Sequence, residues 1–127
     1  VVVENPKQVV DVSEHDGKIN WEKLKSEGID GAILRIGWGV GYTDEYFDYN
    51  ISECKRLGIP YGLYLYSYAY DANFAYAEAD STIERLQGYD LTDMSYPIYY
   101  DIEAFKAYNH DGAKCTFTAI AVIVRSS

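Results

Sequence analysis

The 127-residue sequence has few cysteines and no long hydrophobic run. Its two cysteines, Cys54 and Cys115, have no histidine or cysteine partner at the spacing of a metal site, so the pattern predicts no structural metal. No stretch reaches the roughly 18 apolar residues that a membrane-spanning helix needs. A chain of this length can bury a hydrophobic core without disulfides or metal ions. We therefore expect one domain that needs no metal and no cofactor and does not cross a membrane.

Basic residues are also scarce, with 11 Lys and Arg against 20 Asp and Glu and a formal net charge of −9. A nucleic-acid-binding protein needs a basic stripe that neutralises phosphates, and this composition argues against one. The same charge disfavours electrostatic docking on anionic membranes or anionic wall polymers. Any substrate is therefore expected to be held through neutral, ring-shaped groups.

Tyrosine, by contrast, is abundant: the chain has 14 Tyr, 4 Phe and 2 Trp. A tyrosine ring offers an apolar face and a polar tip, which suits contact with carbohydrate rings as well as with protein surfaces. For any single tyrosine, packing in the core is the commoner role. Composition alone therefore assigns no single tyrosine to a ligand.

Short β-rich runs alternate with amphipathic segments along the chain. The expected strands span residues 8–12, 31–37, 61–68 and 98–102, and the expected helices span residues 21–27, 44–57 and 72–86. Asn20 is a suitable N-cap for the first helix, and Gly28 and Gly58 suit the ends of the first two helices. Cys54 fits as a small buried hydrophobe in the second helix. This alternation predicts an α/β fold with a parallel sheet or barrel and right-handed crossovers.

Polar and aromatic residues gather at the end of each expected strand. Ligands bind at the carboxyl ends of the strands in a parallel α/β fold, so these residues form one constellation. Its members are Asp11, Ser13 and His15 at the first strand, Arg35 and Trp38 at the second, Tyr64, Tyr66 and Tyr68 at the third, and Tyr100, Asp101 and Glu103 at the fourth. His15 and Arg35 are the weaker candidates, because a loop hydrogen bond and an ion pair are their ordinary roles.

Asp101 and Glu103 form the most specific feature of this constellation. Residues two apart on a strand point to the same side, and their Cα atoms lie roughly 6.6 Å apart. Two carboxyl groups this close in a dry pocket do not both ionise easily, so one holds its proton while the other stays an anion. Glycoside hydrolysis needs this combination, because the leaving oxygen takes up a proton and the sugar cation needs a negative partner. The spacing alone is weak support, since Asp-x-Glu also occurs on solvated surfaces.

In five blocks the sequence resembles the Chalaropsis-type lysozymes, glycoside hydrolase family 25. The blocks occur in order, are spaced as in one domain, and cover roughly residues 7 to 105. They are Asp11-Val12-Ser13-Glu14-His15 with Gly17-x-Ile19-x-Trp21, then Ile33-Leu34-Arg35-Ile36-Gly37-Trp38-Gly39, Asp44-x-x-Phe47-x-x-Asn50, Gly58-Ile59-Pro60-x-Gly62-x-Tyr64-x-Tyr66-Ser67-Tyr68-Ala69, and Tyr96-Pro97-x-Tyr99-Tyr100-Asp101-x-Glu103. Five ordered matches outweigh the weakness of the Asp-x-Glu spacing taken by itself.

The resemblance implies a TIM-like parallel β/α barrel, of which residues 1–127 hold about the first four strand–helix units as a single partial catalytic domain. It implies an N-acetylmuramidase that hydrolyses, with retention, the β-1,4 bond between N-acetylmuramic acid and N-acetylglucosamine in peptidoglycan glycan strands, without a cofactor. It also implies an extracellular or cell-wall location. Val1, Val2 and Val3 lack the basic start of a secretion signal, so any export signal is expected to lie outside this sequence.

The family's functional residues carry over to matching positions of this chain. Glu103 corresponds to the general acid that protonates the leaving oxygen and later activates water. Asp101 corresponds to the anionic partner, which either stabilises the sugar cation or orients the N-acetyl group of the substrate as internal nucleophile. Asp11 matches the active-site aspartate of the first strand. The residues expected to bind substrate are Tyr64, Tyr66, Tyr100, Arg35 and Trp38.

The end of the sequence departs from the family pattern. The family's barrel continues well past this chain, and its later strands supply another active-site aspartate. Asp111 lies in the polar loop expected over residues 103–114, which is the wrong place to replace it. The run from Phe117 to Arg125 fits a helix or a strand, because it is too short and too uniform for periodicity to decide. Residues 114–127 are therefore expected to form an atypical or truncated end.

This ending leads to further expectations about the chain itself. An open barrel edge and an uncovered apolar face favour self-association, and we expect weak or absent activity. Two other classes of function stay open beside the lysozyme: an inactive copy that binds glycan through its tyrosines, and a self-assembling module without catalysis.

Overall fold

The computed structural model describes residues 8–69, 71–108 and 114–123, with the backbone alone from residue 101 onward. Its centre is a six-stranded sheet in the order β1-β2-β4-β5-β6, with β3 paired to β2 outside this path. The parallel strands are β1 (Val9–Val12), β2 (Gly31–Trp38), β4 (Tyr61–Tyr66) and β5 (Ile98–Tyr108). The predicted α/β class with a parallel sheet is thereby confirmed.

Two strands run antiparallel to their neighbours. β3 (Tyr42–Thr43) folds back onto the end of β2 and pairs Gly37 with Thr43 and Trp38 with Tyr42. β6 (Lys114–Ile123) pairs along β5, from Ile98 opposite Ile123 to Tyr108 opposite Lys114.

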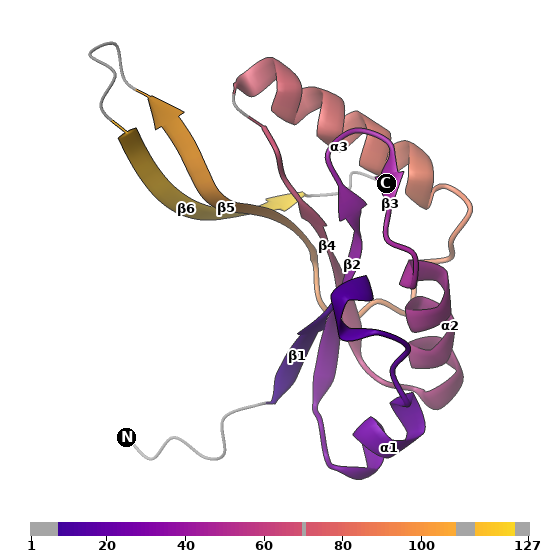
Figure 1. Ribbon diagram of the computed structural model, residues 1–127. Helices are drawn as coiled ribbons and strands as arrows, with labels where there is room; N and C mark the ends of the chain where they lie inside the picture. Colours follow the sequence, from indigo (N-terminus) through magenta and orange to yellow (C-terminus); the bar gives the residue numbers. More distant parts are fainter. Residues whose placement is uncertain (1–7, 70, 109–113, 124–127) are drawn as a thin grey trace, which may run out of the picture.

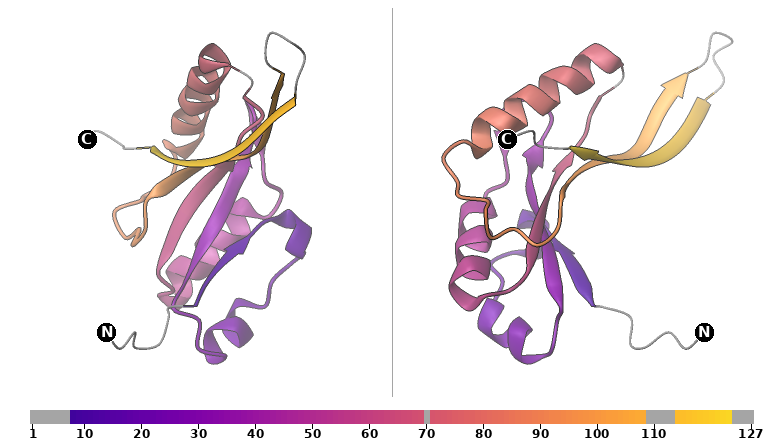
Figure 2. Two further views of the ribbon diagram at one scale, coloured as in Figure 1. Left: turned by 90° about the vertical axis from the view of Figure 1, so that its left-hand side faces the viewer. Right: turned by 180° about the vertical axis from the view of Figure 1, so that it is seen from behind.

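The α-helices of the described ranges all cover one face of the sheet, and β5 and β6 curve away on the other side (Figures 1 and 2). A short 3-10 helix, η1 (Glu14–Asp16), follows β1. The α-helices are α1 (Trp21–Ser26), α2 (Phe47–Leu57) and α3 (Ala72–Leu86). Within the described ranges, no helix is long and apolar enough to cross a membrane.

Local sequence explains where these helices begin and end. The side chain of Asn20 accepts a hydrogen bond from the Lys23 backbone N–H and caps α1 as predicted. Gly58 follows α2 with φ 68°, a left-handed conformation that glycine adopts without a steric penalty. Asp71 caps α3 through the Phe74 N–H.

The hydrophobic core lies between the sheet and the helices. Trp21 from α1 and Phe47, Ile51 and Cys54 from α2 are almost fully buried. They meet buried side chains of the sheet: Val12, Ala32, Leu34, Ile36, Tyr61, Leu63 and Ile98. The indole N–H of Trp21 donates to Asn50 Oδ1 at 2.9 Å, which satisfies the indole donor and the amide oxygen of these two buried residues. Cys54 is fully buried, as its expected role as a small hydrophobe requires.

The last strands differ from the prediction made for residues 103–114. The expected polar loop is replaced by strand as far as Tyr108, and the segment left open between helix and strand is the strand β6. Thr, Ile and Val are frequent in β6, and such residues fit a pleated surface. Three of the four predicted strand–helix units are therefore seen, while β5 leads into an antiparallel partner. Closure into a TIM-like barrel stays a prediction.

Candidate functional site

The sheet face turned away from the helices carries most of the predicted site residues. Tyr64 and Tyr66 are half-buried and alternate along β4 with the fully buried Leu63 and Leu65. A β-bulge in β2 interrupts the register after Arg35, so that Arg35 pairs with Tyr64 and Trp38 with Tyr66. Residues directly opposite on neighbouring strands share a face. The bulge thus brings Arg35 and Trp38, three apart in the sequence, to the face of Tyr64 and Tyr66.

A pocket of about 290 Å³ opens at the carboxyl ends of β2 and β4, and its lining defines what we call the aromatic pocket. Its lining residues are Glu14, His15, Arg35, Trp38 and Tyr68. Three elements that are distant in sequence contribute to it, namely η1, the end of β2 and the residues after β4. This is the edge of a parallel sheet at which ligands bind.

Arg35 is held by an ion-pair network beneath the aromatic pocket. Its Nε donates to Asp44 Oδ2 at 2.8 Å and its Nη2 to Glu14 Oε1 at 3.2 Å. The same Asp44 oxygen accepts the Glu14 backbone N–H at 2.9 Å. The side chain of Asp44 is fully buried and that of Arg35 nearly so. The network therefore ties the segment after β1 to the start of α2, and Arg35 reaches the pocket with two carboxylates already paired to it.

Aromatic rings surround this guanidinium. The Arg35 Cζ lies 4.9 Å from the centroid of the Trp38 ring, a cation–π arrangement. Trp38 stacks on Tyr42, with ring centroids 5.8 Å apart and planes within 5°. Tyr66 and Tyr68 meet edge to face at 5.3 Å. Trp38 and Tyr68 line the pocket, and Tyr42 and Tyr66 each contact one of these two rings. Tyr42 and Tyr68 are exposed and are not among the predicted substrate-binding residues.

The three predicted catalytic residues lie on two separate strands. Asp11 is exposed on β1 and pairs with Ile33 of β2. Asp101 is the backbone partner of Tyr66 across the β4–β5 ladder, and Glu103 lies on β5 two residues further. The side chains of Asp101 and Glu103 fall outside the described part of the structure, so their roles stay predictions.

Tyr100 differs from the other predicted substrate-binding residues. Its side chain is buried at 6 % exposure, and its hydroxyl donates to Glu78 of α3 and lies 2.8 Å from the Ser67 hydroxyl. It faces the helices and is not among the residues that line the aromatic pocket. Burial, followed by the hydrogen bond to Glu78, raises the pKa of Tyr100 above that of an ordinary tyrosine. In this arrangement the ring of Tyr100 packs against α3.

Glu78 is a residue that the sequence analysis missed. Its side chain is fully buried in α3. Its Oε1 accepts the Ser67 hydroxyl at 2.7 Å, and its Oε2 accepts the Tyr68 backbone N–H at 2.8 Å. The spacing of Glu78, Thr82 and Leu86, each four residues apart, was the available signal, because it places two polar residues on the buried stripe of the helix.

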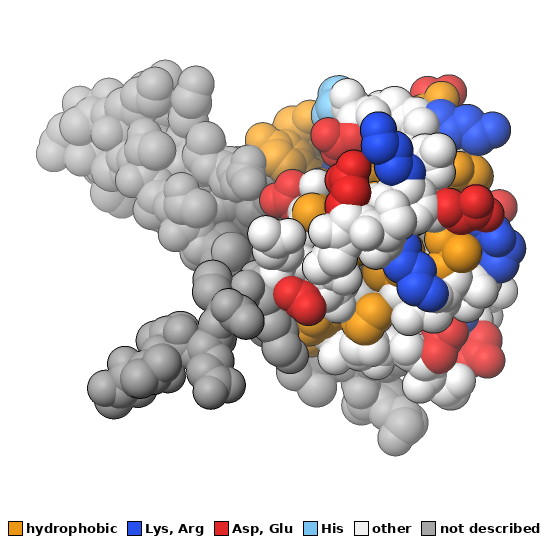
Figure 3. All heavy atoms as spheres, turned by 90° about the horizontal axis from the view of Figure 1, so that it is seen from below, with side chains coloured by type: hydrophobic (Ala, Val, Ile, Leu, Met, Phe, Trp, Pro, Cys, Tyr) orange, Lys and Arg blue, Asp and Glu red, His pale blue; other side chains and the backbone are white. Residues whose placement is uncertain are grey.

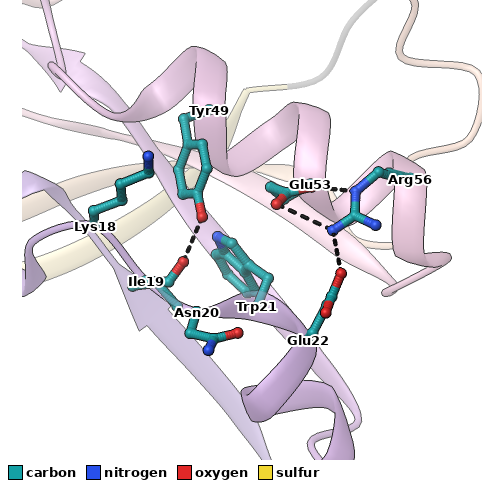
Figure 4. A pocket seen from close by; sticks show the side chains of 8 residues that line it. All are labelled: Lys18, Ile19, Asn20, Trp21, Glu22, Tyr49, Glu53 and Arg56. Carbon is teal, nitrogen blue, oxygen red and sulfur yellow. Dashed lines mark hydrogen bonds and ion pairs between the residues drawn. The ribbon is translucent and has the colours of Figure 1, made fainter.

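A second pocket, of about 320 Å³, lies over α1 and α2. Its lining residues are Lys18, Ile19, Asn20, Trp21, Glu22, Tyr49, Glu53 and Arg56. Figure 4 shows Arg56 between two carboxylates, with Nη2 3.0 Å from Glu22 Oε1 and Nε 2.5 Å from Glu53 Oε2, and the Tyr49 hydroxyl directed at the Ile19 carbonyl. These groups bind one another and brace α1 against α2. Although this pocket is the larger, the chemistry favours the aromatic pocket, which lies at the strand ends.

Charge is dispersed over one face of the described residues. The view from below shows Asp and Glu side chains interspersed with Lys and Arg over the described residues of that face (Figure 3). Such a face has no strong field of one sign with which to steer a charged polymer.

Comparison with known proteins identifies relatives over most of this chain. A family model described as glycosyl hydrolases family 25 matches residues 10–124. The chain is 32 % identical over 108 residues to Lysozyme M1 from Streptomyces globisporus, an alignment that covers 85 % of this chain and 35 % of the relative. The chain thus spans about a third of the length of this curated relative.

Solved structures give the same result. The modular autolysin LytC from Streptococcus pneumoniae is 42 % identical with a TM-score of 0.74, over 90 % of this chain and 26 % of the autolysin. The same autolysin in complex with synthetic peptidoglycan ligand is 41 % identical, also with a TM-score of 0.74. A bacterial lysozyme from Streptomyces coelicolor is 28 % identical with a TM-score of 0.66, over 87 % of this chain and 49 % of the lysozyme. Since the family model matches most of its length, the chain belongs to glycosyl hydrolases family 25.

Proposed function

We propose that this chain provides the catalytic strand and part of the sugar-binding surface of a peptidoglycan-cleaving lysozyme. The observation that carries the proposal is the backbone pairing of Asp101 with Tyr66, at the sheet edge where the aromatic pocket opens. A pneumococcal relative is described in complex with synthetic peptidoglycan ligand. The bond proposed for cleavage is the β-1,4 bond between N-acetylmuramic acid and N-acetylglucosamine, and the site of action is the cell wall or its exterior.

Glu103 and Asp101 divide the chemistry in this proposal. The Glu103 carboxylic acid gives its proton to the glycosidic oxygen as the bond from that oxygen to the anomeric carbon breaks. Asp101 stays an anion and either stabilises the sugar cation or orients the N-acetyl oxygen that bonds to the anomeric carbon. Glu103, now a carboxylate, takes a proton from the water that attacks this carbon, so the configuration is retained. Asp11 faces the same substrate from β1.

Clearing of a purified peptidoglycan suspension tests the proposal. The rate of clearing is measured for the unchanged chain and for the variants Glu103→Gln and Asp101→Asn. Glu84→Gln, on the exposed side of α3, is the matched control. The unchanged chain, which spans about a third of its curated relative, is expected to clear the suspension weakly or not at all. Where it clears, we expect Glu103→Gln to lower the rate by about 10²-fold or more, as loss of a general acid does, and Glu84→Gln to leave the rate unchanged. Magnetic resonance of the first products identifies their anomer and tests retention. Clearing by Glu103→Gln at the rate of the unchanged chain contradicts the assignment.

A glycan-binding role without catalysis is the second candidate function, favoured by the exposed rings of Tyr42 and Tyr68 beside the pocket. In this case the chain sediments with insoluble peptidoglycan, the suspension stays turbid, and Glu103→Gln sediments equally well. A chain that neither sediments with peptidoglycan nor clears it contradicts both candidate functions.

We also propose that the first four parallel strands of a TIM-like barrel are β1, β2, β4 and β5. β1 is an edge of the described sheet, and Val9 on it is 38 % exposed; an edge strand offers unpaired backbone groups to a second copy. We expect the chain to self-associate and Val9→Lys to weaken association. A constant monomer mass by light scattering across concentrations contradicts this.

A further inference from the structure

The described sheet ends in two different strands, β1 on one side and β6 on the other. β6 is 10 residues long, whereas β1 has 4 residues. One side of β6 forms the ladder with β5, and no other strand of the described ranges pairs with its outer side. The outer side of an edge strand presents backbone N–H and C=O groups that can pair with a strand of another chain. β6 is therefore the longer of two open edges.

The first half of β6 projects from the body of the molecule. Where β5 ends and β6 begins, the two strands extend beyond the other strands of the sheet and away from the α-helices (Figures 1 and 2). The ladder is long, since it runs from Tyr108 opposite Lys114 to Ile98 opposite Ile123. The edge of β6 is thus presented by a strand whose inner side is already paired, as a strand that accepts a partner requires.

The two edges differ in their protection against pairing. Edge strands of stable proteins are usually short, or carry charged residues or proline. β1 has this protection, because it is short and carries the exposed Asp11. β6 contains neither proline nor glycine, and its only charged residue, Lys114, is its first. A long edge of high β-propensity and low charge favours pairing with an identical strand. The partner that fits β6 is therefore a second copy of this chain.

The position of Lys114 selects the orientation of that pair. In a parallel pair in register, the two Lys114 residues would lie side by side, and like charges directly opposite each other are destabilising. In an antiparallel pair they lie at opposite ends of the 10-residue strand, roughly 30 Å apart. A two-fold axis through the middle of β6 gives this arrangement, and two-fold dimers are the commonest homo-oligomers.

We propose that β6 is a dimer interface, on which β6 of a second copy pairs antiparallel, so that two sheets join into one across a two-fold axis. The inference rests on the self-association included in the proposed function and names its interface. β1 then lies at both outer ends of the joined sheet. Association through β1 is the weaker step, so Val9→Lys reduces assembly beyond the dimer and leaves the dimer intact.

Disulfide formation tests the interface and its orientation. With the axis at the middle of β6, Cys115 of one copy lies opposite position 122 of the other. Within one copy these two positions are roughly 23 Å apart along the strand, which is too far for a disulfide. A disulfide between Cys115 and a cysteine at position 122 therefore joins two copies. We expect Val122→Cys to give a covalent dimer on copper–phenanthroline oxidation, seen by electrophoresis without reducing agent.

Three further chains make this result specific. Adding Cys115→Ser to Val122→Cys is expected to abolish the covalent dimer, because the disulfide joins unlike positions. Ile83→Cys, at an exposed position of α3, measures links that form by random collision. The unchanged chain is expected to link no more than this control, since Cys54 is fully buried. Efficient linkage of the unchanged chain through Cys115 would overturn the antiparallel orientation.

Sedimentation equilibrium measures the same interface without a covalent link. We expect Ile120→Lys, which places a charge in the middle of the edge, to raise the Kd of the dimer about tenfold or more. Ile83→Lys on α3 is the matched control and is expected to keep the Kd of the unchanged chain. Circular dichroism checks that each variant is folded. The interface is refuted if the unchanged chain stays a monomer at every concentration, or if Ile120→Lys dimerises as tightly as the control.

The clearing assay separates this inference from the proposed hydrolysis. A monomer that clears peptidoglycan overturns the β6 interface and leaves the hydrolytic function standing. A dimer linked between Cys115 and position 122 that does not clear peptidoglycan supports the interface and counts against hydrolysis by this chain.

Discussion

Glu78 Oε1 accepts a hydrogen bond of 2.7 Å from the hydroxyl of Ser67, and this contact joins the middle of α3 to the end of β4. The other carboxylate oxygen accepts the backbone N–H of Tyr68, and the hydroxyl of Tyr100 donates to the same carboxylate. One buried side chain thus fixes the segment that carries Tyr68 and the strand position just before Asp101. The carboxylate therefore holds the chain where it leaves β4 after Tyr66.

Replacing Glu78 by Ala is expected to destabilise the fold by about 3 kcal/mol, since buried donors left without an acceptor cost about 1–3 kcal/mol each. The stability of Glu78→Gln is expected to lie between those of Glu78→Ala and the unchanged chain. Its amide oxygen still accepts a hydrogen bond, but its amide NH₂ group, itself a donor, faces other donors. Urea unfolding followed by circular dichroism measures the effect. Glu84→Ala, an exposed glutamate of the same helix, serves as control, and a Glu78→Ala midpoint equal to that of this control would show that the network does not stabilise the fold.

Replacing Arg35 by Ala is expected to cost about 3–5 kcal/mol, the range for breaking a buried ion pair. Asp44, whose side chain is fully buried, loses its cation and keeps only backbone donors. Arg56→Ala is the comparison, because Arg56 also contacts two carboxylates but its side chain is 51 % exposed. Exposed pairs contribute little, so its urea midpoint is expected to match that of the unchanged chain. Equal midpoints for the two variants would contradict the structural role of Arg35.

Replacing Gly37 by Ala is expected to destabilise the chain by about 1–3 kcal/mol, as overpacking of a filled space does. The added methyl group would lie 1.8 Å from the Tyr42 carbonyl oxygen and 2.7 Å from Arg85 Nη1, so β3 must move away from β2. Gly88→Ala is the control, because nothing lies within 4 Å of its added methyl group. Thermal unfolding compares the two. The near-ultraviolet signal of the Trp38–Tyr42 stack should weaken in Gly37→Ala alone, and an unchanged signal would count against the packing described.

Much of the helix-covered part of the fold follows from local sequence patterns. α3 spans Ala72–Leu86 as predicted, because its composition and the flanking Asp71 and Gly88 define it locally. α2 begins at Phe47 rather than at Asp44, since the Asp44 carboxylate is bound to Arg35 and to two backbone N–H groups. That arrangement depends on contacts distant in sequence, which periodicity does not contain.

The site was harder to predict for the same reason. Alternation along the fourth strand shows that Tyr99 and Tyr100 point to opposite faces, but both residues are tyrosine, so the pattern does not say which face meets α3. The structure turns Tyr100 toward Glu78. The bulge after Arg35 also leaves no local signal, although it decides that Arg35 and Trp38 share a face. Tyr42 was missed because β3 forms only through pairing with β2.

Cys54 is expected to be unreactive toward thiol reagents in the folded chain. Burial raises its pKa from 9.0 to about 12, so as pH rises past 9 the folded thiol stays protonated while the unfolded thiol becomes the reactive thiolate. In a Cys115→Ser variant, labelling at pH 8.5 should therefore proceed only through unfolding and accelerate strongly in urea. The contribution of the protonated thiol to stability is complete below pH 9 and declines as pH rises toward 12. Fast labelling without urea, at the rate of a free thiol, would show that Cys54 is not enclosed by α2 and the sheet.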